Sequence, residues 1–372
     1  MNSNEVSIFD ADSEATKRLI TQGVNVNELN RHGENALFYA DYEKAMVLIE
    51  AGINFNHIDY YGKNALFNSD TFGYGCELSK LLIDLGLDVN QVATHSYRKL
   101  HEGNTPLFHS NSDKAKLLIE HGSDLHHTNN WKANALFFSD HNTSKLLIEI
   151  GLDVNHIANG RVNALFHADL NKSKLLIGSD IDIHLVSRSG ANALFYSDFK
   201  TSDILLKFGI DVNQVNNMGN NALFNADYDK MRVLIDNGIY LNQSDNLYGN
   251  NILFYLNGHN DKCKLLIDAG INIHHLNKKL KNALFFSDYE NSKLLIDAGI
   301  DVNHSDADGC NALFHGKYEI EKYKLLIEHG IDIYKKDEWG ADALFFHNRK
   351  DIGDLIDAEK KNRSNSGHFL NV

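Results

Sequence analysis

One tetrapeptide, Asn-Ala-Leu-Phe or a close variant, recurs along nearly the whole chain of 372 residues. A degenerate copy, Ser7-Ile8-Phe9, precedes these copies, and successive copies mostly lie 29 residues apart, with a single step of 41. The phenylalanines of the motif are Phe38, Phe67, Phe108, Phe137, Phe166, Phe195, Phe224, Phe254, Phe285, Phe314 and Phe345. A period of 20–50 residues is typical of repeat architectures, in which each unit packs only on its neighbours. The spacing therefore predicts twelve stacked units.

Each unit reads as two helices followed by an extended hairpin. In a clean copy, Asn282 caps a short first helix of about one and a half turns, and Leu284 faces inward. Asp288 caps the second helix, and Gly299 ends it in a left-handed conformation. The capping aspartate recurs as Asp41, Asp70, Asp140, Asp169, Asp198 and Asp227.

Glycines divide the units. The helix-ending glycine is present in most copies, and Ser179 is the expected exception. A second glycine ends the hairpin turn two residues before the next asparagine cap. Because Lys132, Arg161 and Leu280 replace it in three units, those three turns are expected to differ from the rest.

The unit resembles the ankyrin repeat. Thr105-Pro106-Leu107-Phe108 matches that family's Thr-Pro-Leu-His, and the pattern LLI-[DE]-x-G-x-[DN]-[VI]-N matches its second helix and following loop. Two departures are the phenylalanine in place of the family's histidine and the loss of four residues between the helices. The resemblance implies an all-α repeat solenoid of about twelve helix–helix–hairpin units, curved, with a concave groove. The compact all-repeat form resembles ankyrin proteins of bacteria, viruses and phages.

The resemblance covers most of the chain and predicts its division. Residues 1–29 form an N-terminal capping repeat, and residues 30–338 form the array, with an irregular enlarged unit at about 64–104. Residues 339–357 form a C-terminal capping repeat. The sequence of residues 358–372 has no repeat pattern and predicts a disordered tail.

Composition excludes several functions. The net charge of −14 disfavours direct nucleic-acid binding, which needs a basic face. Three scattered cysteines make no disulfide framework, and the histidines have no metal-ligand spacing, so we expect no metal and no cofactor. No enzyme motif is present, so we expect no catalytic activity. Without an apolar run of membrane-spanning length, we expect a cytoplasmic protein, in a host cytoplasm if it is delivered or encoded by a virus or phage. The 45 asparagines suggest an AT-rich genome rather than chemistry.

Variable residues on the constant framework are the candidates for a binding site. The residue after the motif phenylalanine is expected on the groove side of the first helix, where aromatic side chains favour partner binding. The alternative is that these rings pack between adjacent first helices. From the second unit onward this stripe consists of Tyr39, Asn68, His109, Phe138, His167, Tyr196, Asn225, Tyr255, Phe286, His315 and Phe346.

The hairpin tips form a second candidate set. Both tryptophans fall there, and we expect alanine in place of either one to leave stability unchanged while weakening a partner. The enlarged unit adds a loop at residues 91–104 that is locally basic and aromatic, either a contact loop or a tolerated insertion. The candidates of the tips and the loop are Tyr61, Tyr97, Arg98, Trp131, Arg161, Arg188, Met218, Tyr248 and Trp339.

These features favour a non-catalytic scaffold that binds one or more proteins of a host or rival system and inhibits or redirects them. We expect a monomer or weak oligomer with no membrane partner. The alternative is an acidic mimic of nucleic acid that blocks the basic channel of a nucleic-acid-acting enzyme. Basic residues in the second helices, among them Lys114, Lys116 and Lys174, are expected to interrupt such an acidic face.

Overall fold

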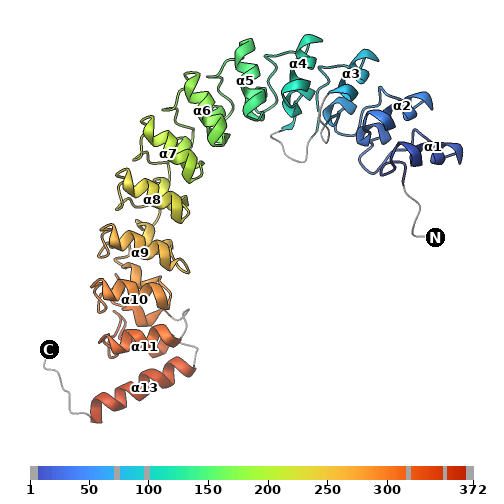
Figure 1. Cartoon of the computed structure of the whole chain (residues 1–372). Helices are drawn as coiled ribbons and strands as arrows, with labels where there is room; N and C mark the ends of the chain where they lie inside the picture. The colour runs from blue at the N-terminus through green and yellow to red at the C-terminus, as the bar shows by residue number, and fades with distance from the viewer. Residues whose placement is uncertain (1–6, 71–75, 96–100, 316–319, 347–349, 366–372) are drawn as a thin grey trace. The chain divides into compact units, whose positions relative to one another are not determined.

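A computed structural model describes residues 7–70, 76–95, 101–315, 320–346 and 350–365. The chain forms two compact units, Met1–Arg188 and Ser189–Val372. Within each unit, short helix pairs follow one another along the chain, from α1 to α6 in the first and from α7 to α13 in the second (Figure 1). The all-helical repeat solenoid predicted from the sequence is confirmed.

The second helices of the repeats are short α-helices. In the first unit they are α1 (Ser13–Thr21), α2 (Tyr42–Glu50), α3 (Glu77–Asp84), α4 (Ser112–Glu120), α5 (His141–Ile150) and α6 (Leu170–Gly178). In the second unit they are α7 (Phe199–Lys207), α8 (Tyr228–Asp236), α9 (Asn260–Asp268), α10 (Tyr289–Asp297) and α11 (Ile320–Glu328). Helices α12 (Ala343–Phe346) and α13 (Lys350–Asn365) end the described chain.

The first helices are single turns of 3₁₀ helix in most repeats. In the first unit they are η1 (Ala36–Tyr39), η2 (Ala65–Phe67), η4 (Pro106–His109), η5 (Ala135–Phe137) and η6 (Ala164–His167). In the second unit they are η7 (Ala193–Phe195), η8 (Ala222–Asn225), η9 (Ile252–Tyr255), η10 (Ala283–Phe285) and η11 (Ala312–Phe314). A segment of three or four residues favours the tighter 3₁₀ helix, although the same motif forms the α-helical turn α12 in the last repeat. Its leucine is fully buried, as at Leu136 and Leu284, so the predicted inward face is confirmed.

The asparagine before each 3₁₀ helix uses both ends of its amide. Asn192 Oδ1 accepts the amide of Leu194 at 3.2 Å, while Asn192 Nδ2 donates to the carbonyl of Asp211 at 2.8 Å. The first bond caps the 3₁₀ helix, and the second ties it to the loop that follows the second helix of the same repeat. The same pair of bonds recurs at Asn163 and Asn311. The predicted asparagine caps are therefore confirmed, and the second bond of each amide is an addition that the sequence did not indicate.

The predicted aspartate caps of the second helices are confirmed. Asp140 Oδ1 accepts the amide of Thr143 at 2.8 Å, and Asp227 Oδ1 accepts that of Lys230 at 2.8 Å. In the enlarged repeat the cap lies farther away along the chain. There Asp70 Oδ2 accepts the amide of Ser79 at 2.9 Å, so the same carboxylate caps α3 across the inserted residues.

Successive hairpins are joined by main-chain hydrogen bonds at their tips. The amide of Asn130 donates to the carbonyl of Glu102 at 2.9 Å, and the amide of Asn246 donates to Met218 at 2.7 Å. Such close approach requires glycine at some turns. A Cβ on Gly219 would lie 2.7 Å from the amide nitrogen of Asn246, and the residue also has a φ of +84°. Glycine thus serves both the left-handed turn and the contact with the next repeat.

The turns without this glycine keep the same handedness. Lys132, Arg161 and Leu280 have φ values of 58°, 59° and 55°, in the left-handed region that glycine occupies elsewhere. At Lys132 and Leu280 the expectation that these turns differ is wrong, because each residue takes the left-handed conformation of the glycine. The Arg161 turn does differ, since Gly160 before it is also left-handed, with a φ of 84°. A related correction concerns the end of α6. Ser179 has a φ of −107°, and it is Asp180, at 61°, that takes the place of the left-handed glycine.

Five lysines of the second helices are buried and point back to the preceding repeat: Lys44 makes one bond, to the carbonyl of Phe9 at 2.8 Å, and the other four make two bonds each. Lys172 Nζ donates to the carbonyls of Leu136 and Ser139 at 2.6 and 2.7 Å. Lys230 and Lys322 make the same two bonds to Leu194 and Ser197 and to Leu284 and Ser287. Lys114 does so with Leu66 and Ser69, and is only 2% exposed. The expectation that Lys114 interrupts an acidic surface is therefore wrong, because its side chain is buried.

These lysines follow an alternation between two kinds of repeat. Repeats with a three-residue 3₁₀ helix, such as η5 and η7, end in a serine whose carbonyl meets the lysine of the next repeat. After a repeat with a four-residue 3₁₀ helix, such as η4 or η6, the second helix of the next repeat carries a threonine in place of this lysine. The two kinds alternate from η1 to η8, and η9 then repeats the longer form. The structural period is thus two repeats over much of the chain.

The last repeat ends the stack differently. Asp342 replaces the capping asparagine, and Lys360 of α13 donates to its Oδ2 at 3.1 Å. Ile352 and Ile356 of α13 are buried. Since α13 continues to Asn365, residues 358–365 are helical, where the sequence analysis expected a disordered tail. The remainder of that expected tail lies outside the described residues.

Candidate protein-binding surface

The predicted stripe is an aromatic ladder within each unit. In the first unit, Phe138 lies on Phe108 with ring centroids 5.6 Å apart, and His109 lies on Phe67 at 5.7 Å. Tyr39 and His167 contact Phe9 and Phe137 in the same way, at 6.1 and 6.4 Å. Each of these four stripe rings therefore contacts the motif phenylalanine of the preceding repeat. We call this stack the aromatic ladder.

The second unit builds the same ladder. The rings of Tyr255, Phe286, His315 and Phe346 lie 5.2–5.9 Å from Phe224, Phe254, Phe285 and Phe314, respectively. The packing alternative for the stripe is thus realised in its contacts. Packing leaves much of the surface open, however, since Tyr39, Tyr196 and Tyr255 are 48%, 57% and 46% exposed. The stripe positions Asn68 and Asn225 carry no ring and leave breaks in the ladder.

Several ladder residues are also tied to their own hairpin by polar contacts. Tyr255 Oη donates to Asp245 Oδ2 at 2.8 Å and accepts from Asn250 Nδ2 at 3.1 Å. Tyr39 makes the corresponding contacts with Glu34 and Asn30. Burial and the bond to Glu34 raise the pKa of Tyr39 to about 12, so this hydroxyl stays a donor at neutral pH. These bonds fix the angle at which each ring meets the surface.

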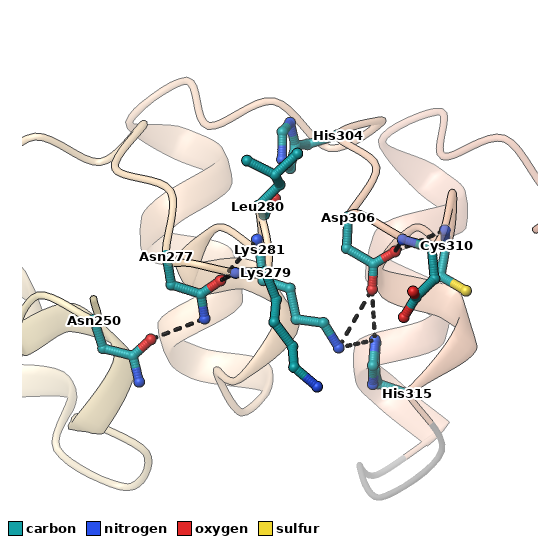
Figure 2. A network of polar contacts seen from close by, with 10 residues as sticks. Asn250, Asn277, Lys279, Leu280, Lys281, His304, Asp306, Cys310 and His315 are labelled. Carbon is teal, nitrogen blue, oxygen red and sulfur yellow. Dashed lines mark hydrogen bonds and ion pairs between the residues drawn. The ribbon is translucent and has the colours of Figure 1, made fainter. Parts of the chain in front are cut away.

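His315 is held in place by a buried network of polar and charged side chains. Figure 2 shows Lys281, Asp306 and His315 pointing toward one another. Lys281 Nζ lies 3.3 Å from Asp306 Oδ2 and 3.1 Å from His315 Nε2, and the Asp306 side chain is 1% exposed. Burial and the adjacent Lys281 charge lower the pKa of His315 to about 4. The neutral imidazole accepts from the ammonium group, so this stripe residue has a structural task.

A hollow of about 480 Å³ opens beside the ladder in the first unit. Its lining combines three predicted stripe residues, Asn68, His109 and Phe138, with His101 of the enlarged repeat. The imidazoles of His101 and His109 stack with centroids 5.8 Å apart, and His101 lies 5.3 Å from the ring of Phe138. The remaining lining residues are Phe67, Phe108, Ser110, Asn111 and Asp140.

On its aromatic side the lining of the hollow holds no acidic side chain. Lys63 Nζ lies over the ring of Phe67, 5.6 Å from its centroid. Desolvation, followed by the charges of Lys63 and His101, lowers the pKa of His109 to about 4, although the residue keeps an exposed edge. Asn104 Nδ2 donates toward His109 Nε2 at 3.1 Å, which fits a neutral ring. The wall is thus aromatic and uncharged, with one carboxylate, Asp140, at the hollow.

The two tryptophans of the hairpin tips differ in their surroundings. Trp131 is only partly exposed, and its ring makes edge contacts with Phe137 and His167 at 5.8 Å each. Trp339 is 71% exposed. The structure thus joins Trp131 to the aromatic ladder and leaves Trp339 at the surface.

The other tip candidates lie apart from the hollow. Arg161, Arg188, Met218 and Tyr248 are exposed, and Tyr61 is half-buried, with its hydroxyl 3.3 Å from His32 Nδ1. Tyr97 and Arg98 fall outside the described residues. Sequence reasoning missed the convergence of His101 with the stripe, because the insertion hides its register with the other hairpins.

The recurrent histidines each contact a carbonyl of the preceding hairpin and do not cluster with one another. His127 Nε2 contacts the carbonyl of Gly103 at 2.7 Å, and His275 Nε2 contacts that of Gly249 at 2.7 Å. Glutamine takes the same place at Gln214, whose amide donates to Gly190 at 2.8 Å. Within the described ranges no three histidine, cysteine or acidic side chains group closely enough to hold a metal ion. The helices described here are also too short or too polar to cross a membrane.

Comparisons with known proteins bear on the fold. No family model and no curated protein sequence matches the chain. Among solved structures, the human ASB11 ankyrin repeat domain aligns at 21% identity and a TM-score of 0.46, over 51% of this chain and 92% of that domain. The ankyrin repeat domain of Bcl-3 aligns at 19% identity and a TM-score of 0.41, over 49% and 89%. The repeated 3₁₀ turn, α-helix and hairpin, with successive hairpins joined by main-chain hydrogen bonds at their tips, give the chain an ankyrin-like fold.

Proposed function

We propose that the chain is a non-catalytic scaffold that binds a partner protein across the aromatic ladder. The supporting observation is that Tyr39 and Tyr255 pack on one side in the ladder and remain 48% and 46% exposed. Rings held in this way lose little conformational entropy on binding, which is why Tyr and Trp are enriched among residues that dominate interface energies.

The partner that this surface suits is a folded protein or peptide of a host or rival system, which binding would inhibit or redirect. Five lysines and four aspartates are buried, so the surface of the described residues keeps nearly the acidic balance of the composition. An acidic mimic of nucleic acid therefore stays the alternative. Its partner would dissociate between low and high salt, whereas a partner held by aromatic contacts would remain bound.

The test is a comparison of two double variants for capture of a partner from cells. Tyr196→Ala with Tyr255→Ala removes two exposed stripe rings of the second unit, of which Tyr255 packs in the ladder. Phe208→Ala with Tyr240→Ala removes two rings of similar exposure outside the ladder, 58% and 57%, in the same unit. We expect one protein to be retained by the wild type and by the second variant and lost by the first. Equal retention by all three chains would contradict the proposal.

A further inference from the structure

The hollow in the first unit has the composition of a pocket for a single planar side chain. Three phenylalanine rings, Phe67, Phe108 and Phe138, and two stacked imidazoles line it. Aromatic rings meet favourably in offset or edge-to-face arrangements at centroid distances of about 4.5–7 Å. The neighbouring pairs of the lining already stand at 5.3–5.8 Å, so a guest ring would continue the geometry of the aromatic ladder.

Charge narrows the choice of guest. The ammonium group of Lys63 lies beside Phe67, and the buried ammonium of Lys114 bonds to the carbonyls of Leu66 and Ser69 behind it. A guest lysine or arginine would meet these like charges. A guest carboxylate would meet Asp140, and the negative charge of the chain disfavours the backbone of a nucleic acid. A neutral aromatic side chain avoids repulsion both from the lysines and from Asp140.

Hydrogen bonding further restricts which side chain the hollow could bind. One oxygen of Asp140 accepts the amide of Thr143 at 2.8 Å, and the carboxylate is exposed at the edge of the hollow. It can accept from the N–H of an indole or the O–H of a phenol. Asn68 lies in the same lining and carries a short amide in place of a ring. Resting on the function proposed above, we infer that this hollow is the anchor pocket for a tryptophan or tyrosine side chain of the partner protein.

The experiment uses the full chain and small probes. N-acetyl-tryptophanamide and N-acetyl-tyrosinamide are titrated while the imidazole proton signals are followed by NMR. The signal of His101 is identified by its loss in His101→Gln. We expect both aromatic probes to shift that signal and to saturate. N-acetyl-leucinamide and N-acetyl-argininamide should bind about five-fold or more weakly, because they lack the ring contact.

Matched variants distinguish probe binding in the hollow from nonspecific binding elsewhere on the surface. Asn68→Phe fills the hollow and should abolish the shift, whereas Asn225→Phe places the same ring at the same register in the second unit and should not. If Asn68→Phe lowers the thermal unfolding midpoint by more than Asn225→Phe, Phe138→Leu replaces it, with Phe286→Leu as its control.

Three results would overturn the inference. They are no saturable shift with either aromatic probe, arginine amide binding as tightly as tryptophan amide, and displacement of tryptophan amide by a ten-residue oligothymidylate. The partner-capture comparison changes only Tyr196, Tyr255, Phe208 and Tyr240, none of which lines the hollow. If the aromatic probes fail to bind but the ladder variant loses the captured protein, the proposed protein binding stands without the pocket. If the probes bind but the ladder variant retains the protein, binding through the ladder is rejected.

Discussion

The ammonium group of Lys172 lies 2.6 Å from the carbonyl oxygen of Leu136, which belongs to the preceding repeat. A second carbonyl, that of Ser139, accepts from the same group at 2.7 Å. Both acceptors stand at the end of the 3₁₀ helix η5, where carbonyls have no partner within the helix. One side chain therefore caps the first helix of its neighbour.

Replacing Lys172 with Met should remove about 1–3 kcal/mol from the free energy of unfolding, because the carbonyl of Ser139 loses the amine and that of Leu136 keeps only the Ser139 hydroxyl as donor, while the apolar stem is kept. Urea denaturation monitored by circular dichroism measures this loss. Lys174→Met, at an exposed position of the same helix, should stay within about 0.5 kcal/mol of the wild type. Equal effects of the two changes would show that the buried amine adds nothing.

Stability should rise between pH 8 and pH 10 in a manner that depends on these lysines. Burial lowers the pKa of Lys114, Lys172 and Lys230 to about 8 and that of Lys322 to about 7. An unfolded lysine titrates near 10.4, so in this window the unfolded chain binds more protons and folding is favoured as pH increases. Each fully buried lysine with a pKa of 8 contributes on the order of 2 kcal/mol over the window.

The measurement for this second prediction is the urea midpoint of wild type and Lys172→Met at pH 8, 9 and 10. The wild-type curve should be steeper by the contribution of one lysine. Parallel curves would mean that the amine titrates normally in the folded protein.

Leu280→Gly should stabilise the chain by up to about 1 kcal/mol. Leu280 is held at a φ of 55° and is 50% exposed, so little packing is lost. The left-handed conformation costs a non-glycine residue about 1–2 kcal/mol, against about 0.5–1 kcal/mol of backbone entropy for glycine. The reverse change at the same hairpin position, Gly219→Leu, should destabilise, because its Cβ would lie 2.7 Å from Asn246. Thermal unfolding of both variants decides; a lower midpoint for Leu280→Gly would refute the argument.

Asn192 should tolerate neither of its two simplest replacements. Alanine removes the cap and the staple to Asp211, at a cost of about 1–3 kcal/mol. Aspartate keeps the cap but turns a carboxylate toward a carbonyl oxygen in a site that is 2% exposed, so it should cost more than alanine at pH 7. The position tolerates Asp342 in the last repeat, where Lys360 supplies the missing donor. Unfolding midpoints at neutral pH that place aspartate above alanine would contradict this order.

Trp131→Ala should destabilise the chain by about 1–3 kcal/mol, since the ring contacts Phe137 and His167. Trp339→Ala removes a side chain that is 71% exposed and should leave the midpoint within about 0.5 kcal/mol of the wild type. Differential scanning calorimetry of the two variants tests the pair, and a similar loss in both would remove the distinction. The outcome expected for Trp131 differs from the sequence prediction.

Features set by a few neighbouring residues could be predicted from the sequence. The repeat period, the inward leucine and the aspartate caps depend on local spacing, and each is confirmed. The 3₁₀ form of the first helix also follows from its length, but a short segment with helical caps reads equally well as one α-helical turn. The end of α13 was missed because a terminal helix has no following repeat to reveal its period.

Features that depend on another repeat were hidden. A lysine in an amphipathic helix normally keeps its charge in water, and nothing near Lys172 in the sequence indicates that acceptors 33 and 36 residues away will enclose it. The handedness at Leu280 is likewise imposed by the neighbouring hairpins. The hollow arises only when the insertion places His101 beside His109 and Phe138.

The alternation of two kinds of repeat has a consequence for how such a chain can change length. Phe137 and Phe195 occupy equivalent positions 58 residues apart, one full alternation. Excising a single repeat would place a buried lysine against a helix end of the wrong kind and leave its former carbonyls facing threonine. Excising two would rebuild the original junction. The interchangeable module of this protein is therefore the pair of repeats.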